Sequence, residues 1–192
     1  MSPFLAAEPG SASSIAAALQ FGLLPMVWTA EDPSQALADY ATVAVFDEVR
    51  AEARVRQLDG FARALEQLAL SHGRVVSPTA IAQQAEVKKS TIVDWLDLLE
   101  SMFLVARVPM YTARPSRRAL AAQPKFYFAD SGIAAAFRAS DNARRAPEAI
   151  GAAREGLVYQ HLLPLPERQG PIMVMPLVTF LLNVVPGNSL AG

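Results

Sequence analysis

VSPTAIAQQAEVKKSTIVDWLDLLESMFL, residues Val76 to Leu104, is the stretch that decides the fold. It predicts a short helix, a tight turn and a longer helix, because apolar residues recur at every third or fourth position. The short helix places Ile81 and Ala85 on one face. Two helices joined in this way form the helix-turn-helix with which proteins enter the major groove of DNA. The apolar stripe of the longer helix consists of Ile92, Trp95, Leu96, Leu98, Leu99, Met102 and Phe103.

Three further helices are expected before this motif. Apolar periodicity predicts them at 15–21, from residue 32 to about residue 53, and at 58–71. Asp32 and Pro33 supply a side-chain cap and a first-turn proline, which together mark a helix start. Gly22 and Gly73 follow two of the predicted helix ends, where glycine commonly stops a helix.

The pattern changes from helical to extended after Leu104. Residues 103–111 and 126–128 read as two strands, and Pro109 marks an edge or a bulge. Two strands directly behind a helix-turn-helix predict a wing. Further helices are expected at 133–138 and 152–163, with a polar loop over 139–150. The predicted fold class is mainly α (α+β): a helical region, a winged helix-turn-helix with a short β-wing, and a truncated C-terminal α/β piece.

Composition limits the kinds of site that the chain can hold. Its net charge is -1 and only 18% of its residues are charged, so any nucleic-acid surface must be local. It has no cysteine, which excludes disulfides, iron–sulfur clusters and cysteine zinc sites and fits a reducing cytoplasm. The two histidines, His72 and His161, lie far apart in the sequence. We therefore expect no metal site and no cofactor.

Residues 172–185, IMVMPLVTFLLNVV, form an apolar stretch near the end of the chain. These fourteen residues are fewer than the roughly 20 that span a bilayer, and Pro176 and Asn183 interrupt them. We expect no stable membrane insertion. An exposed apolar tail of this kind favours pairing with a second copy of the chain.

Lys88, Lys89, Ser90 and Thr91 begin the longer helix of the helix-turn-helix. In a DNA-binding protein, lysines at this end contact phosphates, and Ser or Thr contacts phosphates or bases. The alternative is an ordinary solvated helix start in a module that only packs against other proteins. Asp94 and Asp97 favour that alternative, because they would repel phosphate if they share the same face.

A second basic group, Arg114, Arg117, Arg118 and Lys125, falls on the predicted wing. Four cations at a wing tip are able to hold a phosphate backbone. The alternative is a charged hairpin that keeps an edge strand soluble.

Other polar residues have structural interpretations. Asp130 precedes the helix expected at 133–138 and is predicted to cap it. His72 is predicted to be a helix-end cation beside the last carbonyls of its helix. His161 is expected to pack within an apolar helix, and Glu155 lacks the partner acids that catalysis would need.

Short motifs follow one another in a characteristic order along residues 15–163. They are FGLLP at 21–25, DY at 39–40, DEV at 47–49, IA at 81–82, STI at 90–92, LLE at 98–100 and PKFYFADSG at 124–132, then Gly151, Glu155, Val158 and Leu162. In this order they resemble the C-terminal region of prokaryotic AAA+-type ATPases, which follows the P-loop module. The resemblance implies a winged helix and, from Gly151, the start of a nuclease-like fold.

The chain departs from that family at both ends. It contains no GxxxxGK[ST] loop to cradle phosphates and no strand ending in paired acids of Walker B type. Residues 164–192 contain one acid, Glu167, and no lysine, so the carboxylates that would hold Mg²⁺ in a nuclease are missing. We expect no catalytic residues and no enzyme activity, and the composition of the tail favours a truncated or frame-shifted end.

These observations predict a non-catalytic C-terminal fragment of an AAA+-type ATPase whose winged helix binds duplex DNA or a partner. Its expected partners are duplex DNA, an ATPase module or a second copy, in the cytoplasm. The alternatives are an assembly module that does not bind DNA, and a remnant of a metal-dependent nuclease-like domain. The expected divisions are 1–30 (linker and helix), 31–123 (helical and winged-helix domain), 124–163 (incomplete nuclease-like fold) and 164–192 (apolar, proline-rich tail).

Overall fold

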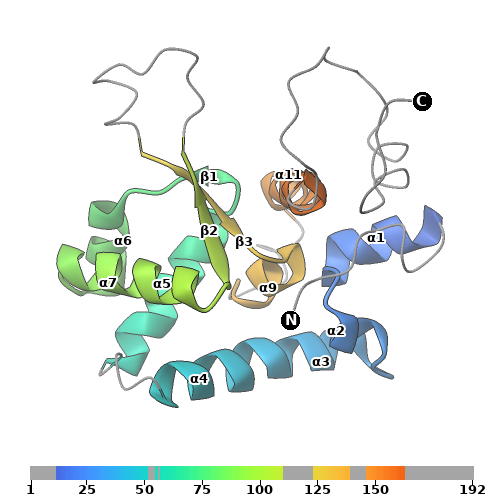
Figure 1. Ribbon diagram of the computed structural model, residues 1–192, viewed down its shortest axis with the longest axis horizontal. Helices are drawn as coiled ribbons and strands as arrows, with labels where there is room; N and C mark the ends of the chain where they lie inside the picture. Colours follow the sequence, from blue (N-terminus) through green and yellow to red (C-terminus); the bar gives the residue numbers. More distant parts are fainter. Residues whose placement is uncertain (1–11, 52–54, 56, 110–122, 139–145, 163–192) are drawn as a thin grey trace, which may run out of the picture.

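The computed structural model describes residues 12–51, 55, 57–109, 123–138 and 146–162. Within these residues the protein is mainly helical, with one small three-stranded antiparallel sheet, as the sequence predicts. Figure 1 shows the sheet in the middle of the molecule, with the helix-turn-helix on one side of it and two later helices, α9 and α11, on the other. The expected wing tip (110–122) and the apolar tail lie outside the described residues.

The chain begins with a helical layer. α1 (Ala12–Phe21) and α2 (Pro25–Trp28) are followed by α3 (Pro33–Asp39), the π-helical turn η1 (Tyr40–Ala44) and α4 (Val45–Ala51). α3, η1 and α4 follow one another without a break and form one long helical segment (Figure 1). The Asp32 carboxylate accepts a hydrogen bond from the Gln35 N–H at 3.1 Å, so the predicted cap is confirmed.

The short helix, the turn and the longer helix lie close to the residues expected for them. α5 (Leu58–Leu70) and β1 (Arg74–Val75) lead into α6 (Pro78–Ala85) and α7 (Lys89–Ser101). The Ser77 hydroxyl caps α6 by accepting from the Ala80 N–H at 3.4 Å. Glu86, at a φ of +57°, turns the chain between the two helices.

The sheet joins a strand before the helix-turn-helix to the two strands after it. β3 (Lys125–Phe128) lies between β1 and β2 (Val105–Val108) and is antiparallel to both. Val105 pairs with Phe128 and Val108 with Lys125. The central strand therefore comes from the part of the chain that follows residue 123, and the core does not divide at that position.

One hydrophobic core connects α3, α4, α5, α6, α7, the sheet and α9. Trp95 is 4% exposed, and its ring meets the Phe61 ring edge to face at 5.2 Å between centroids. Ile81, Ile92 and Leu99 share this interior, as expected from their spacing.

Phe103 corrects the predicted stripe of the longer helix, since its side chain is 86% exposed. α7 ends at Ser101, and Phe103 takes a left-handed conformation with a φ of +57°. The Phe103 N–H donates to the Glu100 carbonyl and the Leu104 N–H to the Leu99 carbonyl, both at 3.0 Å. These bonds form a Schellman turn, which sends Leu104 rather than Phe103 into the core.

Two helices follow the sheet: α9 (Ser131–Ala136) and α11 (Pro147–Leu162). The loop expected over 139–150 is wrong from residue 147, because Pro147 begins α11, where a first-turn proline is favourable. A small second cluster of Ile15, Ala18, Leu23 and Leu157 joins α11 to the N-terminal helix.

Gly132 lies where α9 meets the turn after α1. A Cβ at this residue would lie 2.2 Å from the Phe21 carbonyl oxygen and 2.8 Å from the Gly22 nitrogen. Both are backbone atoms of the opposite segment, so no side-chain rotation would relieve the clash. The close approach of the two segments requires glycine here.

We expect Gly132→Ala to lower the free energy of unfolding by about 2 kcal/mol or more, because the added methyl group separates α9 from the turn after α1. Gly151→Ala is the matched control. Gly151 is an exposed helical glycine with no atom within 4 Å of an added Cβ, so alanine there should stabilise the protein by about 0.5–1 kcal/mol. Urea unfolding of both variants measures the difference, and equal effects would contradict the close approach.

Candidate functional site

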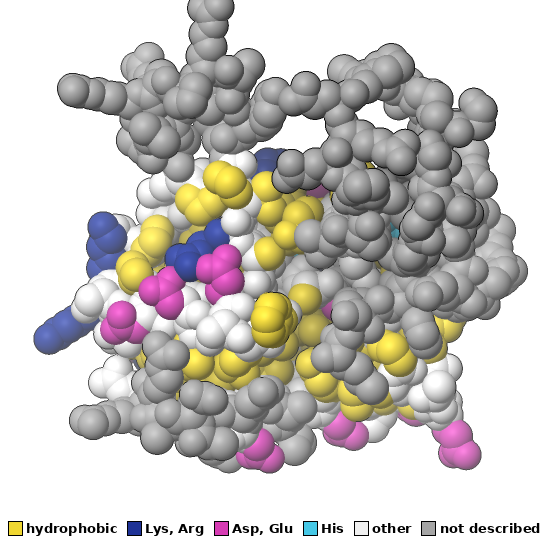
Figure 2. Space-filling view, viewed as in Figure 1, with side chains coloured by type: hydrophobic (Ala, Val, Ile, Leu, Met, Phe, Trp, Pro, Cys, Tyr) yellow, Lys and Arg dark blue, Asp and Glu magenta, His cyan; other side chains and the backbone are white. Residues whose placement is uncertain are grey.

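The start of α7 projects from the body of the molecule. Lys88 takes an extended conformation just before the helix, and Lys89 is its first residue. The side chains of Lys88, Lys89 and Ser90 are exposed, and that of Thr91 is half-buried. Figure 2 shows Lys and Arg side chains projecting at the edge of the molecule where Figure 1 places α6 and α7. The predicted recognition end therefore faces solvent.

Three of the four acids on α7 and in the turn before it are held by arginines. Arg107, on β2, binds Asp97 at 2.7 Å and also contacts Glu100. Arg63, on α5, lies 3.5 Å from Glu86 in the turn before α7. Arg63 and Arg107 supply two positive charges against the three negative charges of Glu86, Asp97 and Glu100, so one negative charge of this group stays uncompensated.

Lys88, Lys89 and Asp94 have no such partner. No hydrogen bond or ion pair joins their side chains to any residue that the structure describes. The start of α7 therefore carries two free ammonium groups against one free carboxylate. Among its side chains the balance is positive, although the protein as a whole has a net charge of -1.

The second basic group is not assembled in the described part of the chain. Arg114, Arg117 and Arg118 lie outside the described residues. Lys125 begins β3, and its ammonium group lies 2.6 Å from the Glu155 carboxylate of α11. Lys125 is therefore already paired, and it serves the packing of α11 on the sheet.

Glu155 has partners that the sequence did not reveal. Besides Lys125, the Tyr127 hydroxyl donates to Glu155 at 2.5 Å, and the Tyr127 ring stacks on Tyr159 at 4.4 Å between centroids. Burial alone would raise the pKa of Glu155, but the bonds from Lys125 and Tyr127 outweigh it and hold that pKa below its usual value. Glu155 thus fastens α11 to the outer face of the sheet.

Asp130 caps α9, as predicted, and also holds the turn after α1. One carboxylate oxygen accepts from the Gly132 and Ile133 N–H groups at 2.8 and 3.3 Å. The other accepts from the Leu23 N–H, far away in the sequence, at 2.6 Å. Asp130 is fully buried. Burial raises its pKa to about 6, although the three hydrogen bonds favour the charged form and so lower the pKa in part.

His72 corrects the expectation of a helix-end cation. It is fully buried, and burial followed by the charge of Arg138 lowers its pKa to about 4. The Phe128 N–H donates to Nδ1 at 3.0 Å. The neutral ring must therefore carry its proton on Nε2, which has no hydrogen-bond partner. The sequence around His72 gives no sign of this contact, because Phe128 lies far away along the chain and reaches His72 only when the sheet forms.

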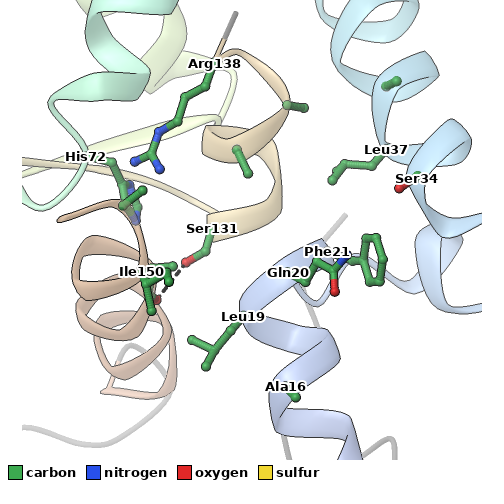
Figure 3. Close-up of a pocket in the computed structure, with 15 residues that line it drawn as sticks. Ala16, Leu19, Gln20, Phe21, Ser34, Leu37, His72, Ser131, Arg138 and Ile150 are labelled. Atoms are coloured by element: carbon green, nitrogen blue, oxygen red, sulfur yellow. Dashed lines mark hydrogen bonds between the residues drawn. The ribbon is translucent and has the colours of Figure 1, made fainter. Parts of the chain in front are cut away.

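A cleft of about 550 Å³ lies at the junction of α1, α3, α9 and α11. In Figure 3 the Arg138 side chain is directed toward His72. Arg138 is 5% exposed, and its guanidinium donates to the Ala69 carbonyl. The Ser131 hydroxyl donates to the Ala153 carbonyl at 3.1 Å. His72 cannot accept a proton from Ser131 in this tautomer, so the two do not form a nucleophile–base pair. Other walls of the cleft are Ala16, Leu19, Phe21, Leu37 and Ile150.

Two kinds of feature are absent from the described residues. They contain no group of three or more His, Asp or Glu side chains placed to hold a metal ion. None of the described helices is both long enough and apolar enough to cross a membrane.

Two buried titratable groups, Asp130 and His72, should compensate each other as the pH changes. Folding raises the pKa of Asp130 from 3.8 to about 6, so its contribution to stability falls as the pH rises through this range. Folding lowers the pKa of His72 from 6.5 to about 4, so its contribution falls as the pH drops. Between about pH 4 and pH 6, folding takes up one proton at Asp130 and releases one at His72.

We therefore expect His72→Asn to reveal the pH dependence of stability that Asp130 causes, because asparagine does not titrate. The asparagine oxygen can still accept the hydrogen bond from the Phe128 N–H, so the fold should be kept. The free energy of unfolding of this variant should decrease from pH 4 to pH 6 relative to the unaltered protein, by at most about 1.4 kcal/mol per pH unit. Denaturant unfolding at several pH values measures this slope. Parallel pH profiles for the two proteins would contradict the compensation.

Comparison with known proteins identifies one family. Residues 13–144 match a family described as a domain of unknown function (DUF8612). Neither the curated proteins nor the solved structures gave a match. Because the matched residues make up well over half of the 192, the chain belongs to the DUF8612 family.

Proposed function

We propose that residues 58–128 act as a winged-helix module that binds duplex DNA through the start of α7. The observation that carries this proposal is the pair of exposed lysines, Lys88 and Lys89, which have no ionic partner among the described residues while nearby Asp97 and Glu86 are neutralised by arginines. Free cations at the start of the longer helix are what phosphate contacts on either side of a major groove require.

The arrangement of elements supports the winged-helix interpretation. A helix (α5), a strand (β1), two helices (α6, α7) and two strands (β2, β3) follow in this order, and β3 pairs with both other strands. The core fixes α7 from behind through Ile92, Trp95 and Leu99, so its outward face is presented rigidly. A rigid helix loses little conformational entropy when it enters a groove.

We place this module in a cytoplasmic protein that has no catalysis of its own. The resemblance of residues 15–163 to the C-terminal region of AAA+-type ATPases supports a role beside an ATPase module, with the DNA held by the winged helix. The missing cysteines fit the cytoplasm. This role rests on the sequence resemblance and on the charge of the α7 face together.

The second candidate is an assembly module that binds protein rather than DNA. Phe103 favours this second candidate. Its left-handed conformation is one that glycine adopts without strain, yet the position carries an aromatic ring that is 86% exposed. Exposed aromatic surface of this kind favours contact with another protein. Val75, on β1, is 55% exposed and adds apolar surface. DNA binding by α7 and protein binding by Phe103 predict different responses to salt and to substitution.

Titration of a labelled duplex with the full chain at increasing salt separates the two candidates. DNA binding should weaken steeply with salt, because each phosphate contact releases a condensed counterion. Lys88→Ala and Lys89→Ala should each reduce the affinity several-fold and reduce the slope of log Kd against log salt by about 0.9. Neither lysine makes a side-chain cap, so the substitutions should leave α7 intact.

Arg154→Ala is the matched control for this titration. Arg154 is an exposed cation on α11, on the other side of the sheet from α7 (Figure 1), and its loss should leave both affinity and slope unchanged. Absence of binding at about 50 mM salt, or equal losses in the Lys88, Lys89 and Arg154 variants, would overturn DNA binding through α7. The assembly candidate would then remain, with Phe103→Ala as its test variant.

A further inference from the structure

The outward face of α7 continues beyond the two lysines. Helical spacing places Lys89, Ser90, Val93, Asp94 and Asp97 on one side of the helix, and all five side chains are exposed. The opposite side is buried in the core at Ile92, Trp95, Leu96, Leu98 and Leu99. If the start of α7 enters the major groove, these exposed side chains are the ones that face the base edges.

Asp94 differs from the other acids of this region. Asp97 is bound to Arg107 and Glu86 to Arg63, whereas no described residue makes an ion pair with Asp94. Asp94 also lines a hollow of about 620 Å³ together with Lys88, Thr91 and Trp95. A free carboxylate beside two lysines weakens the attraction to phosphate, so electrostatic attraction alone gives no reason for an acid at this position.

The preferred partner of a carboxylate on a base in the major groove is cytosine, whose exocyclic amino group donates a hydrogen bond to it. Adenine also has an amino donor there, but its neighbouring N7 acceptor opposes the second carboxylate oxygen, and phosphates and the acceptor edge of guanine repel the carboxylate. Val93 precedes Asp94 and is 36% exposed, and an aliphatic side chain in the groove packs against the methyl group of thymine. Both contacts are made to pyrimidines.

We propose that Asp94 and Val93 are the base-reading residues of α7, with Asp94 selecting cytosine and Val93 favouring a neighbouring thymine. The lysines then supply affinity without sequence preference, and this pair supplies the preference. The inference rests on the proposed DNA binding and names the part of the duplex that the same surface recognises.

Selection from a randomised duplex library, followed by affinity measurement on duplexes that differ at one base pair, tests this division of roles. The unaltered chain should select cytosine at one position, with a preference of about tenfold over the other bases. Asp94→Asn should change that preference to adenine, because an asparagine amide pairs with the two groove atoms of adenine. It should also bind unrelated duplexes more tightly, since a negative charge is removed.

Asp97→Asn is the matched control, because it makes the same chemical change on the same helix face at an acid that Arg107 already holds. It should leave the cytosine preference unchanged, whereas Val93→Ala should weaken the preference for thymine at the neighbouring position. Binding that depends on Lys88 but shows no base preference, or a preference that Asp94→Asn leaves unaltered, would overturn this inference alone. Absence of binding to any duplex would overturn both it and the proposed function.

Discussion

A single buried carboxylate, that of Asp130, determines how the two ends of the described chain meet. It accepts hydrogen bonds from Gly132 and Ile133 at the start of α9 and from Leu23 after α1. Unpaired, a buried charge would cost several kcal/mol, so these bonds are what make the position tolerable. Gly22, at a φ of +76°, and Gly132 allow the backbones to come close enough for the contacts. Since α9 follows directly from β3, the same contacts hold the N-terminal helices against the sheet on which the helix-turn-helix packs.

The helix-turn-helix depends on this arrangement only for support, because its own interior fixes the direction of α7. The edge-to-face contact of Phe61 with Trp95 joins α5 to α7 at the centre of the core. With that side buried, the lysine-bearing start of α7 has to project outward. Local charge is then adjusted by arginines from neighbouring elements, Arg63 from α5 and Arg107 from β2, which neutralise acids that would otherwise dominate this face. At the start of α7, tertiary structure rather than composition thus pairs Glu86 and Asp97 with arginines and leaves Lys88 and Lys89 without an ionic partner among the described residues.

Local patterns in the sequence predicted the elements well, because apolar spacing and caps act over a few residues. Asp32 and Asp130 cap helices as predicted from their side-chain chemistry. The two errors have different causes. Phe103 continues the helical spacing but is turned outward by a local Schellman turn whose left-handed residue is not glycine. His72 was predicted to be a helix-end cation, but a long-range contact decides its role, because it accepts the Phe128 N–H inside the core. The candidate site was partly predictable: the lysines at the start of α7 were identified from position alone, whereas the pairing of Lys125 with Glu155 and of Asp97 with Arg107 required the fold.

The central claim is that the start of α7 is the surface that contacts duplex DNA. The most direct measurement follows backbone amide resonances of the isotopically labelled chain during titration with a short duplex at low salt. If DNA binds there, the largest shifts should fall in residues 88–94, and α11, on the other side of the sheet, should be unaffected. Shifts concentrated around Phe103 or on α11, with residues 88–94 unchanged, would contradict it.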